Sequence, residues 1–126
     1  MKKEIFALAL LLALFALSLW NSHNLDILTG EISELVRQSG SLAEKGDWES
    51  AADKAHEAVA MWDEHSSYTH IVLRHSDIDS ISDDFYELKS SIFQQEPGVS
   101  AGNAEMVIAH LNSISSIEKL RLGSIF

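Results

Sequence analysis

The sequence contains no cysteine, which excludes thiol catalysis, thiolate zinc sites and a disulfide framework. This absence does not indicate a compartment, because many extracytoplasmic proteins also lack cysteine. The chain of 126 residues is in the range of one domain. Roughly 105 residues follow its apolar start, enough to bury about two-thirds of their unfolded surface without a disulfide or a metal.

Basic residues are scarce beyond the N-terminal segment. Residues 21–126 contain eighteen Asp or Glu and seven Lys or Arg, a balance of −11, and the whole chain has a formal net charge of −10. Binding to nucleic acid or to anionic lipid headgroups depends on neutralising negative charge with Lys and Arg. The sequence has neither a stripe of basic residues nor a known motif for recognising nucleic-acid bases. We therefore do not expect nucleic acid as a partner.

Short catalytic and ligand-binding motifs are also missing. The sequence has no DxDxDG calcium loop, no HExxH, no GxSxG and no phosphate-binding loop. We therefore expect a protein that is not an enzyme, and assign no catalytic residue, cofactor or metal ligand.

A long apolar run is what the N-terminus does contain. Residues 5–20 read IFALALLLALFALSLW, with Ser18 as the single polar residue, and Lys2 and Lys3 precede them. As a helix this run spans roughly 24 Å, slightly less than the hydrocarbon core of about 30 Å. The run is interpreted as a signal anchor or a signal-peptide core, and the positive-inside rule places the two lysines in the cytoplasm.

Cleavage of this segment stays open. Ala16 and Ser18 have the spacing that a signal peptidase accepts, and cleavage would give a secreted protein beginning at Leu19. Leu17 and Trp20 keep the region apolar, and an indole ring suits the outer membrane interface. We favour an uncleaved, single-pass anchor in the cytoplasmic membrane.

The remaining sequence shows apolar residues at alternating steps of three and four, which predicts amphipathic helices. The residues at these steps are Leu25, Leu28, Ile32, Leu35, Ser39 and Leu42; Trp48, Ala52, Ala55, Val59 and Trp62; Ile78, Ile81, Phe85, Leu88 and Ile92; and Val107, Leu111, Ile114 and Ile117. The predicted fold is all-α, with an anchor over residues 1–22 and an extracytoplasmic antiparallel bundle of about four helices, or stacked helical hairpins, over 23–126.

The segment GDWESA, residues 46–51, is expected to join the first two helices. Gly46 can take the left-handed conformation that ends a helix near Lys45, and Asp47 can cap the next helix. The segment resembles the turn of a tetratricopeptide repeat. A single copy predicts a helical hairpin rather than an array, which needs about three copies at a period of 34 residues.

The later helix ends are predicted from polar and flexible residues. The second helix is expected to continue to about His75, with a bend or break among the Ser and Thr residues of 66–69. Ser76 then begins a capping-box pattern for the third helix. The Pro- and Gly-rich segment QEPGVSAGN, residues 95–103, predicts a loop, and Asn103 is expected to cap the fourth helix.

Several softer signals extend along the chain: the apolar start, GDWESA, Trp62 with His65, HSDIDSI at residues 75–81 and IEKLRLGSIF at residues 117–126. In this arrangement the sequence resembles a family known as domain of unknown function 4363, small membrane-anchored helical proteins of Gram-positive bacteria. The resemblance covers nearly the whole chain, and the segment from Pro97 to Gly102 is a departure from it or an insertion. It implies an anchor and a helical extracytoplasmic domain, with no assigned activity.

Six histidines are the unusual feature of the composition. His65, His70 and His75 recur every five residues, which leaves successive side chains about 140° apart on a straight helix. A metal site would need a helix break or a partner such as His110. The simpler interpretation is that His65 flanks the apolar seam and that His75 ends a helix, where a cationic imidazole is favoured.

Two other sets of side chains have alternative interpretations. Trp48 and Trp62 are either core residues or an aromatic ligand site, and we favour the core. Carboxylates close enough to act in pairs or to hold a cation are more simply a solvated helix surface. These carboxylates are Asp53, Glu57, Asp63 and Glu64, and then Asp83, Asp84 and Glu87.

The sequence therefore predicts a non-enzymatic scaffold or protein-interaction module, held in the cell envelope with an unidentified envelope protein as its partner. The alternative is an exported sensor that binds a ligand or divalent metal through histidine and acidic residues.

Overall fold

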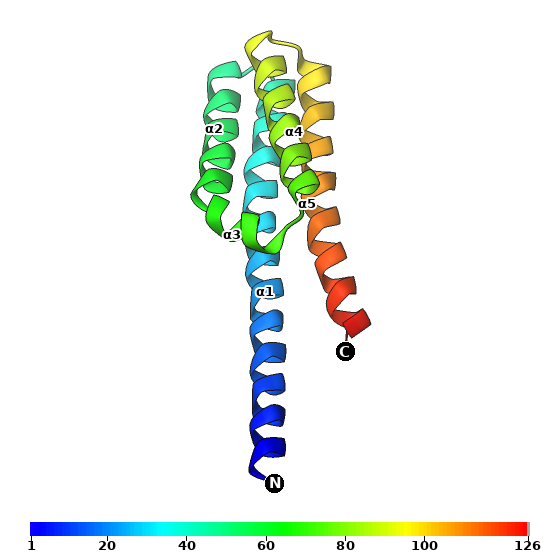
Figure 1. Ribbon diagram of the computed structural model, residues 1–126. Helices are drawn as coiled ribbons and strands as arrows, with labels where there is room; N and C mark the ends of the chain where they lie inside the picture. The colour runs from blue at the N-terminus through cyan, green and yellow to red at the C-terminus, as the bar shows by residue number, and fades with distance from the viewer. Residues whose placement is uncertain (126) are drawn as a thin grey trace.

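The computed structural model describes the backbone of residues 1–125 and the side chains of these residues except 68, 71, 72 and 118–125. Within this range the chain is all-α, as predicted, and Figure 1 shows α1 projecting well beyond the other helices. The helices are α1 (Lys2–Glu44), α2 (Trp48–Glu64), α3 (Ser66–Val72), α4 (His75–Phe93) and α5 (Pro97–Ile125).

The four long helices form an antiparallel bundle with an up-down-up-down course (Figure 1). Helix α1 packs against α2 and α5, and α4 packs against the same two helices. The short helix α3 lies in the connection from α2 to α4, at the end of the bundle from which α1 projects. This arrangement confirms the predicted antiparallel bundle of four helices.

The core is built from one face of each long helix. All five apolar positions predicted for α4 are buried, which confirms the spacing argument there. Other predicted positions are only partly buried, namely Leu35, Leu42, Trp48, Ala52 and Val59, and the prediction for Ile117 was wrong, since it is 42% exposed. Helix α2 turns Ala51, Ala55 and Ala58 inward, which lets the neighbouring helices approach closely. The buried apolar residues of α1 and α2 are Leu25, Leu28, Ile32, Val36, Ala43, Ala51, Ala55, Ala58 and Trp62.

Small residues bring α1 close to its neighbours. A Cβ built on Gly40 would lie 2.8 Å from the Cβ of Ala104, so the backbone of α1 nearly touches α5 there. The adjacent Ser39 is fully buried, and its hydroxyl donates a hydrogen bond of 2.7 Å to the carbonyl of Ala51. This bond satisfies the buried hydroxyl and links α1 to the first turn of α2.

The connection between α1 and α2 has the predicted form. Helix α1 ends at Glu44, Gly46 has a φ of 81°, and the Asp47 side chain accepts a hydrogen bond from the N–H of Ser50. A left-handed glycine followed by an acidic N-cap reverses the chain within three residues.

The prediction that the second helix continues to about His75 was wrong. Helix α2 ends at Glu64, the break predicted near residues 66–69 occurs at His65, and Leu73 and Arg74 are extended. Leu73, in this extended pair, is buried in the core. His75 is consequently the first residue of α4 and not the end of α2.

The capping box predicted at Ser76 was also wrong. Arg74 is the N-cap of α4 and forms no side-chain cap bond, while its carbonyl accepts from the N–H of Ile78. After the extended Leu73–Arg74 pair, α4 starts at His75, and its N-cap lies two residues before Ser76. Acidic side chains near the N-terminus still suit the helix dipole, and Asp77 lies in the first turn.

The prediction of a loop at residues 95–103 was wrong, since residues 97–103 are helical. Helix α5 begins at Pro97, and the connection from α4 contains only residues 94–96. Proline at the first helical position loses no hydrogen bond and has a suitable φ, so it starts this helix. Asn103 lies inside α5 and is not a cap, because its Nδ2 donates to the Glu87 carbonyl and to Ser91 Oγ.

Gln95 closes α4 in a conformation that favours glycine, with a φ of 56°. Its N–H and that of Glu96 donate to the carbonyls of Ile92 and Ser91, as in a helix-ending turn. Since a side chain is strained at this φ, Gln95→Gly is expected to raise the free energy of unfolding by about 1 kcal/mol.

Urea unfolding followed by circular dichroism measures this change. Gln94→Gly is the matched control, because Gln94 has a helical conformation and glycine there should be destabilising. Equal shifts for the two variants would contradict the assignment.

Candidate functional site

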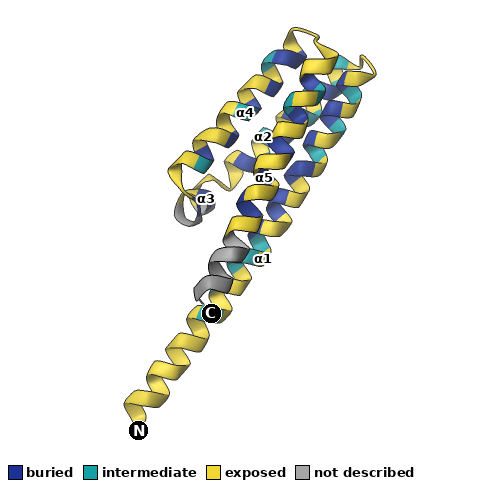
Figure 2. Cartoon of the chain, turned by 90° about the vertical axis from the view of Figure 1, so that its right-hand side faces the viewer, coloured by how far each residue is buried: buried dark blue, intermediate teal, exposed yellow. Residues whose placement is uncertain are grey.

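The N-terminal part of α1 carries apolar side chains that nothing in the bundle covers. In its most apolar eighteen-residue stretch no residue is buried, and the helix is long and apolar enough to cross a membrane. Figure 2 shows exposed residues along this part, with buried residues only where α1 lies inside the bundle. A signal sequence and a single-pass anchor share these properties.

Helix α1 has no break between this apolar part and the bundle. One helix runs from Lys2 to Glu44, through the predicted boundary at residues 22 and 23, and Leu25 is its first buried residue. Trp20, the last residue of the apolar run, is 60% exposed. The orientation of the bundle is therefore coupled to that of the apolar segment through a continuous helix.

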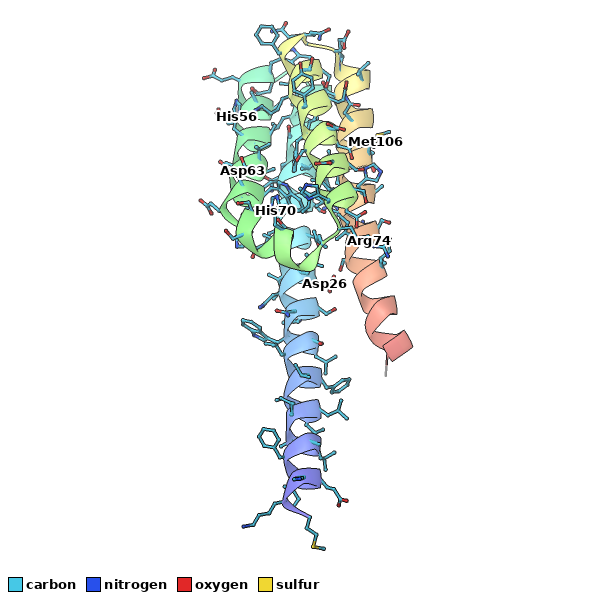
Figure 3. All side chains as sticks on the ribbon, in the orientation of Figure 1. Asp26, His56, Asp63, His70, Arg74 and Met106 are labelled. Carbon is cyan, nitrogen blue, oxygen red and sulfur yellow. The ribbon has the colours of Figure 1, made fainter. Side chains whose placement is uncertain are left out.

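The histidines lie at several places along the bundle. Figure 3 places His70 on α3, at the end from which α1 projects, and His56 on α2, nearer the opposite end. The Nδ1 atoms of His65 and His70 hydrogen-bond to the carbonyls of Met61 and Ser66, one helical turn earlier. The rings of His70 and His75 stand edge to face at 6.0 Å. The Nδ1 atoms of His65 and His70 are thus hydrogen-bonded to backbone carbonyls of the preceding helical turn.

His110, the partner considered for a metal site, instead contacts α4. Its Nδ1 pairs with Oδ2 of Asp84, whose side chain is largely buried while that of His110 is half-exposed. Among the described residues, no group of three or more histidine, aspartate or glutamate side chains is arranged to hold a metal ion. The structure therefore does not bring His65, His70, His75 and His110 together as ligands.

The other carboxylates singled out in the sequence are exposed and belong to two helices. Glu57 forms an ion pair of 3.7 Å with Lys54, and Asp63 points outward from α2 in Figure 3. This placement agrees with a solvated helix surface. The exposed acidic residues are Asp53, Glu57, Asp63 and Glu64 on α2, and Asp83 and Glu87 on α4.

The tryptophans have different surroundings. Trp62 is 4% exposed and belongs to the core, which confirms the interpretation favoured from the sequence. Trp48 packs against the core but also lines a groove of about 460 Å³ between α2 and α4, at the end opposite the apolar segment. Phe93 borders the same groove and is 88% exposed. This groove, which is also lined by His56 and by the oppositely charged Glu49 and Lys89, is called the distal groove.

A second, longer hollow follows the outer side of the α1–α2 pair. It consists of two adjoining cavities of about 430 Å³ and 520 Å³ that share Glu31, and we call it the α1–α2 groove. Apolar and amide side chains form much of its surface, and acidic side chains line it. The lining residues are Trp20, Asn21, Asn24, Ile27, Leu28, Glu31, Glu34 and Leu35 of α1, Glu57, Ala60, Met61 and Glu64 of α2, and His65.

Sequence reasoning missed the α1 side of this groove. Trp20, Asn24, Ile27 and Glu31 are spaced by four, three and four residues, and so lie on one face of α1. This face is the neighbour of the predicted core face, and Ile27 on it is 46% exposed. An apolar residue just outside the core stripe was the signal that could have indicated a second contact surface.

The fold and these surfaces define a class: a four-helix bundle on a helix with the properties of a signal sequence or membrane anchor. The chain belongs to the DUF4363 family, a domain of unknown function, whose model matches residues 19–125. This match confirms the resemblance seen in the sequence. Comparison with curated proteins and with solved structures gives no match.

Proposed function

We propose that this protein is a non-enzymatic, partner-binding module held on the outer face of the cytoplasmic membrane by the N-terminal part of α1. In this proposal residues 1–22 are an uncleaved anchor and residues 23–126 form the extracytoplasmic domain. The observation that supports it most is the single helix that contains both an uncovered apolar stretch and a major part of the bundle core. Lipid would cover the apolar side chains, and the bundle would stand directly above the membrane surface.

Two further features support a binding role. Among the described residues, the two grooves expose apolar side chains without any arrangement suited to metal binding. Exposed apolar surface bordered by polar residues commonly marks contacts with other proteins. The acidic surface disfavours anionic lipid and nucleic acid as ligands, which leaves a protein as the favoured partner.

A crosslinking experiment in intact cells tests this function. The tagged, full-length protein is treated with a membrane-impermeant crosslinker and purified from solubilised membranes. We expect one envelope protein in nearly equimolar amount. The Trp62→Ala variant, which keeps the apolar segment but loses core packing, should recover much less of it at the same membrane level. Recovery of no protein in stoichiometric amount, or of the same proteins by both forms, would contradict the proposal.

A further inference from the structure

The α1–α2 groove is lined by four glutamates, and only two of them form ion pairs among the described residues. Its described lining residues include Glu31, Glu34, Glu57 and Glu64 but no lysine or arginine. Arg37 pairs with Glu34 and Lys54 pairs with Glu57, and both pairs are on the surface. Glu31 and Glu64 form no ion pair with another described residue. Glu31 and Glu64 therefore give the groove a negative charge that no ion pair among the described residues offsets.

The surface between these carboxylates is apolar. Leu35 and Met61 are partly buried between the two walls, and Ala60 is exposed. Toward the apolar segment the groove continues along Ile27 to Trp20. A ligand seated here would bury apolar side chains in the centre and place its charges against glutamates at the edges, as in a standard protein interface.

The dimensions fit a helix. The lining residues of α1 extend from Trp20 to Leu35, a length of about 22 Å at 1.5 Å per residue, or about four helical turns. On α2 the lining residues Glu57, Ala60, Met61 and Glu64 follow the spacing of one helix face. Two nearly antiparallel helices thus present a groove that a third helix can occupy by side-chain packing.

We propose that the α1–α2 groove docks a basic amphipathic helix of a partner protein, with Lys or Arg side chains facing Glu31 and Glu64. This inference rests on the proposed function and names the surface and the chemistry of the partner. Charge complementarity favours this occupant over a second copy of the chain. If the grooves of two copies faced each other, glutamates would lie opposite glutamates. The distal groove, with charges of both signs, makes no such selection.

Binding of a defined probe tests the charge requirement. The probe is a fluorescent fifteen-residue amphipathic peptide of leucine and lysine, and its counterpart has glutamate in place of lysine. Full-length protein in nanodiscs of zwitterionic lipid is titrated, with binding read as fluorescence anisotropy. We expect the lysine peptide alone to bind, and its affinity to fall with added salt because exposed charges are screened.

Variants of equal charge locate the site. Glu31→Lys with Glu64→Lys should weaken binding of the lysine peptide at least about tenfold, because attraction becomes repulsion at both walls. Glu87→Lys with Glu105→Lys makes the same change on α4 and α5, away from the groove, and should alter binding less than about twofold. Circular dichroism checks that both double variants remain folded. Equal weakening by the two double variants would overturn the proposal, because the peptide would then respond only to net charge.

A photocrosslinking experiment in cells separates this inference from the proposed function. A photoreactive amino acid replaces Ala60 in the groove or, as the control, Ala109, which is exposed on α5. Crosslinks from position 60 to a helical segment rich in Lys and Arg support the docking site. Crosslinks to a partner from position 109 alone, or to a second copy of this chain from position 60, overturn the docking site but leave a binding function. Crosslinks from neither position contradict both.

Discussion

Replacing Trp62 with alanine is expected to lower the free energy of unfolding by about 3–5 kcal/mol, as measured for large aromatic truncations in cores. The indole is 4% exposed and lies in the last turn of α2, where alanines on the same face have already brought the neighbouring helices close. Its removal leaves a cavity that these small side chains cannot fill. Such a loss is a large part of the stability of a typical domain.

Urea unfolding in detergent micelles, followed by circular dichroism, measures the effect of Trp62→Ala. Trp20→Ala is the matched control, since the same side chain is removed at a position that is 60% exposed outside the bundle. We expect the control to unfold at the denaturant concentration of the unchanged protein. If both variants unfold together with that protein, Trp62 does not fill the core and the packing of α2 is different.

The second large effect is expected where Gly40 of α1 lies close to Ala104 of α5. A Cβ added at Gly40 would lie 2.8 Å from Ala104 Cβ, a distance that a methyl group cannot accept without movement of a helix. Gly40→Ala should therefore lower the free energy of unfolding by about 1–3 kcal/mol through overpacking. The direction of this change in the free energy of unfolding is informative, because replacing glycine with alanine normally stabilises a helix.

Gly30→Ala gives the opposite expected result. Gly30 is also inside α1, but a Cβ there would meet nothing within 4 Å, so the substitution should raise stability by roughly 0.5–1 kcal/mol. Adding Ala104→Gly to Gly40→Ala should restore part of the lost stability by relieving the contact. Thermal or urea unfolding of these variants distinguishes the cases, and stabilisation by Gly40→Ala would show that the two helices are farther apart.

Local rules predicted the parts of the fold that depend on local chemistry. Gly46 and Asp47 close one helix and begin the next because a left-handed glycine and an acidic cap act within a few residues. Each residue of the apolar face of α4 was predicted correctly, because residues spaced alternately by three and four lie on one face of an α-helix.

The errors occurred where packing outweighs local preference. Pro97, Gly98 and Gly102 predict a loop when judged alone, yet they lie in the first two turns of α5. Buried residues on this part of the helix offset the poor helix propensity of glycine: Ser100 is fully buried and hydrogen-bonds to Ser91, and Ala104 fits against α1. Contacts between distant segments are not visible in a single sequence.

The candidate site was predictable only in part. Glu57 and Glu64 were identified in the sequence as a charged surface, which is how they lie on α2. Their relation to Glu31 and Glu34 depends on which helix becomes the neighbour of α2 and at what register. Helical spacing gives the face of each helix but not the pairing of faces, so the groove could not be predicted.

The orientation of the chain across the membrane is the central claim, and the lack of cysteine allows a direct measurement. Single cysteines are introduced as Glu4→Cys, before the apolar stretch, and Ser41→Cys, at the exposed far end of α1. Both are treated with a membrane-impermeant maleimide on intact protoplasts. We predict labelling of Ser41→Cys on intact protoplasts, and of Glu4→Cys only after the membrane is permeabilised. Labelling of Glu4→Cys with protection of Ser41→Cys would contradict the account, because the bundle would then lie inside the cell.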